Sequence, residues 1–244
     1  MAKIKLTLEY DGTHYVGWQV QPNGVSVQQR VELALKQLLG ETVRVHSSGR
    51  TDAGVHASGM VCHLTTERDL PMSAWREGVN RFLPDSIAVR TAEPVADDFH
   101  ARFSAKGKRY CYTILQDDVR SPLLMRTSWQ VRQSLDLSAM RRAAGLFVGE
   151  HDFAAFRTSG CSAETTCRKV YSVDLSSTDR LLLIDVSGSG FLKNMVRMMV
   201  GTLVEIGRGK RQVTDISELL LRNRDVGPSL TAPPQGLCLM EVWY

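Results

Sequence analysis

Residues 49–57 read Gly-Arg-Thr-Asp-Ala-Gly-Val-His-Ala and lie between two strand-like runs at 43–47 and 60–66. The segment places a cation, Arg50, and a carboxylate, Asp52, in a glycine-rich turn. Glycine permits backbone conformations and close approaches that side chains forbid, so such a turn can hold a reactive group against a ligand. Asp and Gly are also ordinary turn residues, and Asp52 could simply cap the turn and pair with Arg50. The segment alone leaves both interpretations open.

The chain around this turn alternates between strand and helix patterns. Residues 3–10 alternate polar and apolar side chains, which predicts a strand with one buried face. Ser26 and Gln29 fit a capping box, and the apolar stripe that follows predicts a helix ended by Gly40. The other predicted elements are a helix from 73 that stops before 84, helices from 136, 191 and 214, and strands at 87–91, 109–115, 170–175, 181–186 and 237–243.

The stretch 94–108 has little apolar periodicity and several charges, which indicates a connection between two comparable halves. Each half mixes strands with interposed helices, a pattern typical of an α+β architecture. We therefore predict two similar α/β subdomains, residues 1–99 and 100–244, with mostly antiparallel sheets that form a continuous core.

The composition is that of an ordinary folded chain and limits the expected chemistry. Apolar residues make up 43% and charged residues 23%, which argues against disordered and fibrous classes. The five cysteines include no Cys-x-x-Cys pair, and the six histidines show no metal-ligand spacing. No phosphate-loop or dinucleotide-binding motif is present. We therefore expect no bound metal and no cofactor, nucleotide cofactors included.

The longest apolar run, residues 191–206, is interrupted by charged residues and is too short and too polar to span a bilayer. The first five residues enter a strand pattern at once and lack the apolar stretch of a secretory signal. We therefore expect a cytoplasmic protein that has no membrane partner.

Basic residues exceed acidic ones by 30 to 26, which gives a net charge of +4. A solvated basic face is one interpretation of this excess, and an anionic partner is the other. The excess gathers in two clusters, Lys106, Lys108 and Arg109 in one, and Arg208, Lys210 and Arg211 in the other.

Residues 49–57 resemble, position for position, the active-site signature of TruA-type tRNA pseudouridine synthases. In that family the aspartate of the signature is the essential residue. The resemblance therefore implies that Asp52 is the catalytic carboxylate, and that Arg50 and Thr51 shape its loop.

Further blocks along the chain are similar to the same family. The block at 108–114 resembles the segment whose first tyrosine meets the target base, which implies this role for Tyr110. The block at 190–201 resembles the one that supplies an arginine partner to the aspartate, which implies this role for Arg197. The remaining blocks lie at 10–13, 17–19, 27–28, 149–153 and 232–237.

Each of these residues also has a structural interpretation. Tyr110 and Tyr112 share one face of the predicted strand and fit a core position. Two apolar stripes on the helix predicted from 191 fit core packing, while Lys193 and Arg197 fall together on another face with Gly201. That face can present two cations to a carboxylate or a phosphate, or it can carry ordinary surface charge.

Conversion of uridine to pseudouridine breaks the bond between ribose C1′ and N1, rotates the base and reattaches it through C5. One ionised carboxylate can suffice, because the uracil leaving group carries its own negative charge. A cation beside Asp52, from Arg197 or Arg50, favours the charged form. Attack on C1′, addition at C6 and removal of the C2′ proton are all compatible with one aspartate.

The resemblance also implies that uridines 38, 39 and 40 of the tRNA anticodon stem-loop are the substrates and that the enzyme is a homodimer. Lys193 and the two basic clusters would contact phosphates and offset the cost of flipping the uridine out of its stack. Two alternatives use the same residues: an RNA-binding module without catalysis, and a hydrolase that acts on a free nucleoside or sugar.

Overall fold

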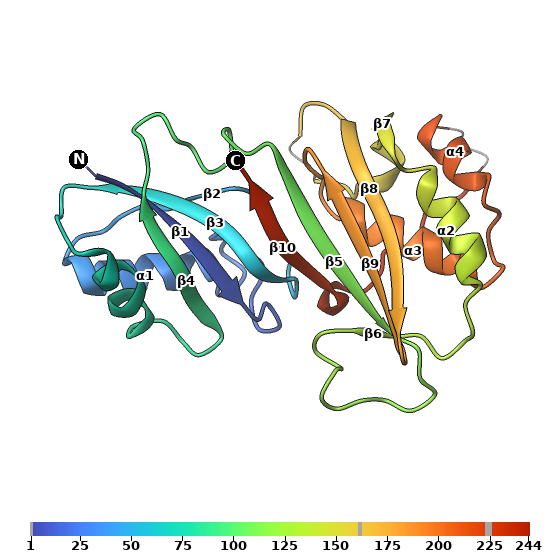
Figure 1. Cartoon of the computed structure of the whole chain (residues 1–244), viewed down its shortest axis with the longest axis horizontal. Helices are drawn as coiled ribbons and strands as arrows, with labels where there is room; N and C mark the ends of the chain where they lie inside the picture. Colours follow the sequence, from blue (N-terminus) through green and yellow to red (C-terminus); the bar gives the residue numbers. More distant parts are fainter. Residues whose placement is uncertain (1, 161–162, 223–225) are drawn as a thin grey trace. The chain divides into compact units, whose positions relative to one another are not determined.

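The computed structural model describes residues 2–160, 163–222 and 226–244. The chain divides into two compact units, Met1–Lys106 with Cys238–Tyr244, and Gly107–Leu237 (Figure 1). The sequence predicted a division after residue 99 and placed the last strand in the second half, whereas this strand lies in the first unit. The difference comes from a pairing between residues about 180 positions apart, which no local pattern can indicate.

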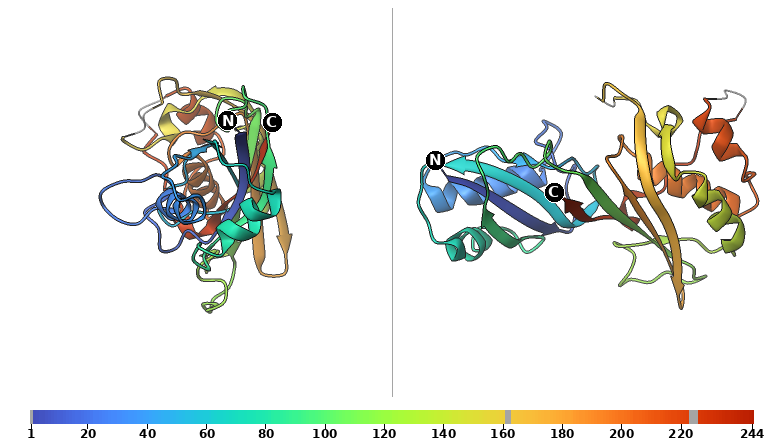
Figure 2. Two further views of the ribbon diagram at one scale, coloured as in Figure 1. Left: turned by 90° about the vertical axis from the view of Figure 1, so that its left-hand side faces the viewer. Right: turned by 45° about the horizontal axis from the view of Figure 1, so that its top comes forward.

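The first unit is built on a sheet with the strand order β4-β1-β3-β10. Neighbouring strands are antiparallel except for β10, which pairs parallel to β3. Helix α1 (Val27–Leu39) lies on one face of this sheet (Figure 2). The strands are β1 (Ala2–Tyr10), β3 (His56–Thr66), β4 (Ile87–Pro94) and β10 (Leu237–Trp243), and the short β2 (His46–Ser47) pairs with β3.

The predicted strand at 3–10 and the helix after Ser26 are confirmed. Ile4, Leu6 and Leu8 of β1 are buried, in step with the alternation of the sequence. The Ser26 hydroxyl accepts a hydrogen bond from the Gln29 amide at 3.2 Å, so it satisfies one of the unpaired N–H groups of the first turn. Gly40 adopts the left-handed conformation that ends the helix, with φ at 73°.

Two predictions in the first unit were only partly right. The run at 43–47 forms a strand only at its last two residues. The helix predicted from 73 is present, but its centre is a π-helical turn at Ala74–Gly78 that buries Trp75. Apolar spacing cannot separate this wider turn from a regular helix, because both bury one side of the segment.

In the second unit the strands follow the order β5-β9-β8-β7, and the three pairings along this order are antiparallel. Helix α2 contacts both α3 and β8 (Figure 1). The strands are β5 (Gly107–Leu115), β6 (Trp129–Gln130), β7 (Gly149–Asp152), β8 (Cys167–Thr178) and β9 (Leu181–Gly188). The helices are α2 (Leu137–Gly145), α3 (Met195–Gly207), α4 (Asp215–Leu220) and the short 3-10 turns η2 (Ala154–Phe156) and η3 (Pro234–Gly236).

Helix α3 begins at Met195, four residues later than predicted. Asn194 precedes it with φ at 62°, a left-handed conformation that cannot belong to a right-handed helix. Lys193 therefore lies outside the helix, and the prediction that it shares a helical face with Arg197 is wrong. The apolar stripes of α3 are core, as Met195, Met199 and Leu203 are fully buried.

The predicted α+β class with mostly antiparallel sheets is confirmed. Within the described residues, no helix is long and apolar enough to cross a bilayer. Among the described residues, Cys62, Cys111, Cys167 and Cys238 form no disulfide, and the fifth cysteine, Cys161, lies outside those residues.

Gly201 of α3 is a position where the second unit tolerates no side chain. A Cβ atom at this residue would lie 1.8 Å from the carbonyl oxygen of Leu230. We expect Gly201→Ala to lower the free energy of unfolding by about 1–3 kcal/mol, because α3 and the backbone at 230–232 must separate. Chemical denaturation measures the change.

The matched control is Gly145→Ala at the end of α2, where an added Cβ meets nothing within 4 Å. Its stability should stay within about 1 kcal/mol of the parent, with any change favourable because Ala is the better helix former. Equal destabilisation by both substitutions would contradict the packing explanation.

Candidate active site

The loop at 49–57 lies against the segment that follows β1, and two glycines make this approach possible. A Cβ at Gly12 would lie 2.0 Å from the Val55 carbonyl oxygen, and one at Gly17 would lie 2.6 Å from the Thr51 carbonyl oxygen. Gly17 also has φ at 109°, a value that side chains disfavour. Residues 10–19 and 49–57 thus pack together, although residues 20–48 separate them in the sequence.

Hydrogen bonds fasten the two segments on either side of Asp52. The Trp18 amide donates to the Thr51 carbonyl at 3.0 Å, and the Gly54 amide donates to the Tyr15 carbonyl at 3.4 Å. The Tyr10 hydroxyl and the Thr51 hydroxyl lie 2.7 Å apart, within the core. Thr51 and Gly54, which flank Asp52 and Ala53, are therefore both hydrogen-bonded to the segment that follows β1.

Asp52 itself opens a tight turn whose closing bond does not use its carboxylate. The Val55 amide donates to the backbone carbonyl of Asp52 at 3.1 Å, and Gly54 takes the left-handed conformation with φ at 76°. The Asp52 side chain is half-buried, and Arg50 is exposed on the same loop. The hydrogen bond that closes this turn is therefore a contact between backbone groups.

His56 closes the loop from the other end. Its Nδ1 accepts a hydrogen bond from the Gly12 amide at 3.1 Å and lies 3.2 Å from an Asp11 carboxylate oxygen. The imidazole is buried in the first unit. These contacts assign His56 to holding the loop.

Tyr110 and Tyr112 differ in their surroundings, although they share one face of β5. The Tyr110 ring is 8% exposed and meets the edge of Phe191, with the ring centroids 5.3 Å apart. Tyr112 is fully buried, and its hydroxyl donates to the Pro233 carbonyl at 2.7 Å. Burial raises the pKa of the Tyr112 hydroxyl far above its usual value, so this group keeps its proton. Tyr112 is structural, and Tyr110 is the candidate for contact with a base.

Arg197 is held at two nitrogens within the second unit. Its Nε donates to the Ala232 carbonyl at 2.7 Å, and one terminal nitrogen donates to the Asn194 side-chain oxygen at 2.6 Å. The Ala232 amide in turn donates to the Arg197 carbonyl at 3.1 Å. Two acceptors on separate nitrogens fix the plane of the guanidinium.

Sequence reasoning missed both of these acceptors. The contribution of Ala232 is a backbone carbonyl, which has no signature in the sequence. Asn194 does carry a signal, since an asparagine directly before an apolar helical pattern is a common left-handed or capping residue. We did not use this signal.

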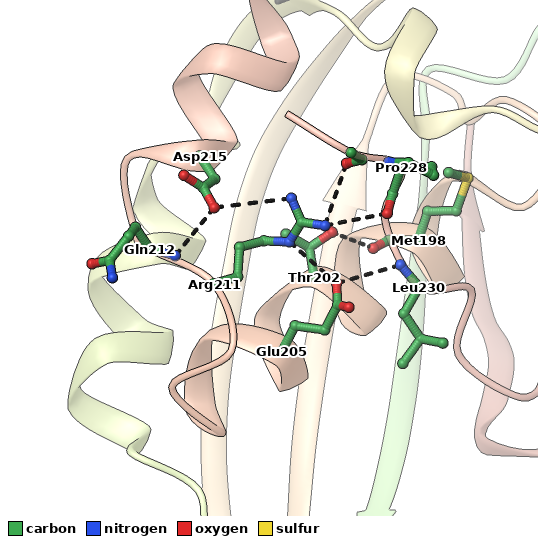
Figure 3. A network of polar contacts seen from close by, with 9 residues as sticks. Met198, Thr202, Glu205, Arg211, Gln212, Asp215, Pro228 and Leu230 are labelled. Carbon is green, nitrogen blue, oxygen red and sulfur yellow. Dashed lines mark hydrogen bonds and ion pairs between the residues drawn. The ribbon is translucent and has the colours of Figure 1, made fainter. Parts of the chain in front are cut away.

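The predicted RNA-binding cluster at 208–211 separates into different environments. Figure 3 shows the Arg211 guanidinium between two carboxylates, 3.2 Å from Glu205 and 4.0 Å from Asp215. It also donates to the Pro228 carbonyl at 3.2 Å. The Arg211 side chain is only 11% exposed, so this placement assigns it to holding the 227–230 segment and does not support the predicted RNA contact.

The other predicted basic residues lie in several environments. Arg208 lies over the Trp129 ring at 5.7 Å, and Arg109 pairs with Asp185 at 3.0 Å. The Lys193 ammonium donates to the Ser159 carbonyl at 3.3 Å. Lys106, Lys193 and Lys210 are exposed, and Lys108 is half-buried.

The candidate residues are thus divided between the two units. Asp52 and Arg50 belong to the first unit, and Tyr110 and Arg197 belong to the second. Among the residues that the structure describes, no group of three or more His, Cys, Asp or Glu side chains could hold a metal ion.

Comparison with known proteins shows what this chain is similar to. The family described as tRNA pseudouridine synthase matches residues 7–104 and 143–244. These ranges include Arg50, Asp52 and Arg197 but not Tyr110. A tRNA pseudouridine synthase A of Syntrophotalea carbinolica is 60% identical over 244 residues, which cover 100% of this chain and 97% of the relative. The corresponding proteins of Citrifermentans bemidjiense and Geobacter sulfurreducens are 56% and 54% identical, cover 100% of this chain, and are themselves covered over 98% and 100% of their lengths. The chain therefore belongs to the tRNA pseudouridine synthase family, whose members isomerise uridine to pseudouridine in tRNA.

Proposed function

We propose that Asp52 is the catalytic carboxylate with which this enzyme isomerises uridines 38, 39 and 40 of the tRNA anticodon stem-loop. The observation that carries the proposal is the loop at 49–57, which is anchored by backbone contacts on both sides of Asp52. A fixed loop suits catalysis, because a positioned group reacts without an ordering cost.

The chemistry requires one bond to break and another to form at the same sugar carbon. The C1′–N1 bond breaks with its electron pair on uracil, the base rotates, and C5 bonds to C1′. The proton that C5 then loses is balanced by one gained at N1. No atom is gained or lost, so no second substrate is needed. Asp52 supports the step at the sugar as an ionised carboxylate.

Tyr110, Arg197 and Arg50 serve the same uridine in this proposal. The Tyr110 ring, held against Phe191, stacks on the uracil during its rotation, and its hydroxyl oxygen takes the proton from C5 while releasing its own proton to solvent. Arg197 and Arg50 supply positive charge that favours the ionised form of Asp52. The fixed guanidinium of Arg197 suits this role better than the exposed Arg50, because its direction is set by two acceptors.

A uridine in a helical stem must leave its stack before the reaction, at a cost of a few kcal/mol. We propose that phosphate contacts offset this cost. The exposed residues Lys106, Lys193 and Lys210 are the strongest candidates for these contacts. Further candidates are Lys108, Arg109 and Arg208. Arg211 is left out because its guanidinium is occupied inside the second unit.

The family resemblance further implies a homodimer that works in the cytoplasm on tRNA. Sedimentation equilibrium tests the first point, and a mass of two 27.2 kDa chains is expected. A single-chain mass at the concentration used for activity would refute the dimer. It would not bear on the proposed role of Asp52. Cell fractionation tests the location.

Replacement of Asp52 by Asn tests the proposed catalyst. The parent enzyme, incubated with unmodified tRNA, should form pseudouridine at positions 38–40 only, as read by chemical mapping. Asp52→Asn should lower single-turnover formation by about 1,000-fold or more, because the amide can act neither as nucleophile nor as base. Unchanged turnover would remove Asp52 from the mechanism.

Two measurements on the same samples exclude the other interpretations. The tRNA affinity of Asp52→Asn should stay within about threefold of the parent and should fall as salt rises, as expected of phosphate contacts. An RNA-binding module without catalysis predicts no pseudouridine from the parent. A hydrolase predicts free uracil and a lighter RNA, whereas isomerisation leaves the RNA mass unchanged.

A further inference from the structure

Asn194 has a left-handed backbone conformation, directly before the right-handed helix α3. Its φ of 62° and ψ of 6° lie in the left-handed region, where a non-glycine residue costs about 1 kcal/mol or more. At this position it interrupts the apolar segment and delays the start of α3 until Met195. A strained residue that persists is a candidate for a functional constraint.

The side chain of Asn194 connects two partners at its two ends. Its Oδ1 accepts from a terminal nitrogen of Arg197 at 2.6 Å, and its Nδ2 donates to the Thr158 hydroxyl oxygen at 2.8 Å. The orientation of the amide follows from chemistry, since a guanidinium only donates and must therefore face the oxygen. Both ends of the amide are thus used, and the side chain has one orientation.

The far partner, Thr158, is itself fastened to the same corner of the second unit. Its amide donates to the Lys193 carbonyl at 3.4 Å, and the Lys193 ammonium donates back to the Ser159 carbonyl at 3.3 Å. The loop that follows η2 therefore holds the Nδ2 end of the Asn194 side chain. A chain of hydrogen bonds runs from this loop through Asn194 to the guanidinium.

We propose that Asn194, braced by Thr158, is a positioning residue that sets the direction of the Arg197 guanidinium for the reaction. This inference rests on the proposed role of Arg197. Ala232 accepts from Nε, and Asn194 accepts from a second nitrogen, so loss of Asn194 removes one of the contacts that set the direction of the guanidinium. The left-handed backbone is what places an amide oxygen within reach of a residue three positions later.

Asn194→Gly is the sharpest test, because glycine adopts the left-handed backbone freely and removes only the side chain. We expect its single-turnover rate at saturating tRNA to fall about 10-fold to 100-fold, as for loss of an aligned electrostatic group. The tRNA dissociation constant and the melting temperature should stay close to those of the parent. A rate within twofold of the parent would overturn the inference.

Asp179→Gly is the matched control. Asp179 is another non-glycine residue of the second unit with positive φ, at 50°, and it is exposed in the turn between β8 and β9. The same type of substitution there should leave the rate unchanged. If Asp179→Gly slowed the reaction as much as Asn194→Gly, the effect would be one of backbone freedom and the inference would fail.

Thr158 gives an independent pair of variants. Thr158→Ser keeps the hydroxyl and should keep the parental rate, whereas Thr158→Val removes it and should slow turnover without weakening tRNA binding. Equal rates for the two variants would contradict the brace. This pair keeps the inference testable if Asn194→Gly fails to fold.

A double-mutant cycle separates this inference from the proposed function. In an Arg197→Ala background, Asn194→Gly should cause no further loss, because the residue it positions is absent. An equal loss in both backgrounds would show that Asn194 acts through another group and would overturn the inference. If Arg197→Ala itself leaves the rate unchanged, the proposed role of Arg197 fails, and the inference fails with it.

Discussion

Backbone packed directly against backbone is the constraint on which the candidate site depends. Gly12 and Gly17 let the segment after β1 touch the loop at 49–57 with no side chain between them. Peptide groups at this distance can form direct hydrogen bonds, as the Trp18 amide does with the Thr51 carbonyl. Direct hydrogen bonds between backbone groups therefore hold the loop. Such contacts allow far less movement than contacts through long side chains.

The second unit uses the same device around Arg197. Gly201 lets the backbone at 230–232 lie against α3, where Ala232 and Arg197 exchange two hydrogen bonds. Gly236 likewise sits against the Tyr112 ring, in contact that a Cβ would block at 2.6 Å. Residues 230–236 are thereby fixed between a buried tyrosine and an arginine. In each unit, glycines hold the backbone near a charged side chain.

Local patterns predicted the parts of the fold that local physics determines. The alternation of β1, the Ser26 cap and the start of a helix at about 136 each depend on neighbouring residues, and all three are present. The pairing of β10 with β3 could not be predicted, since it joins residues about 180 positions apart in the sequence. The start of α3 was misplaced because apolar periodicity continues through 191–194, whereas the backbone of Asn194 turns the other way.

The candidate residues show the same division between local and distant information. The loop at 49–57 was found by its motif, and the structure adds the reason for its glycine-rich partner at 10–19. Arg211 was assigned to RNA from its charge alone. Its acceptors, Glu205, Asp215 and the carbonyls near 228, approach from three segments that a charge count cannot bring together. Clustering of charge predicts accessible cations only when the fold leaves those cations unoccupied.

The central claim is that the loop fixes the position of the Asp52 carboxylate, in addition to supplying it. The single-turnover rate of Asp52→Glu measures this most directly, because the acid is kept and only its reach is extended by one methylene. A rigid loop cannot compensate for a shift of about 1 Å, so the rate should fall about 100-fold with tRNA affinity unchanged. A glutamate variant that retains nearly the parental rate would contradict the account.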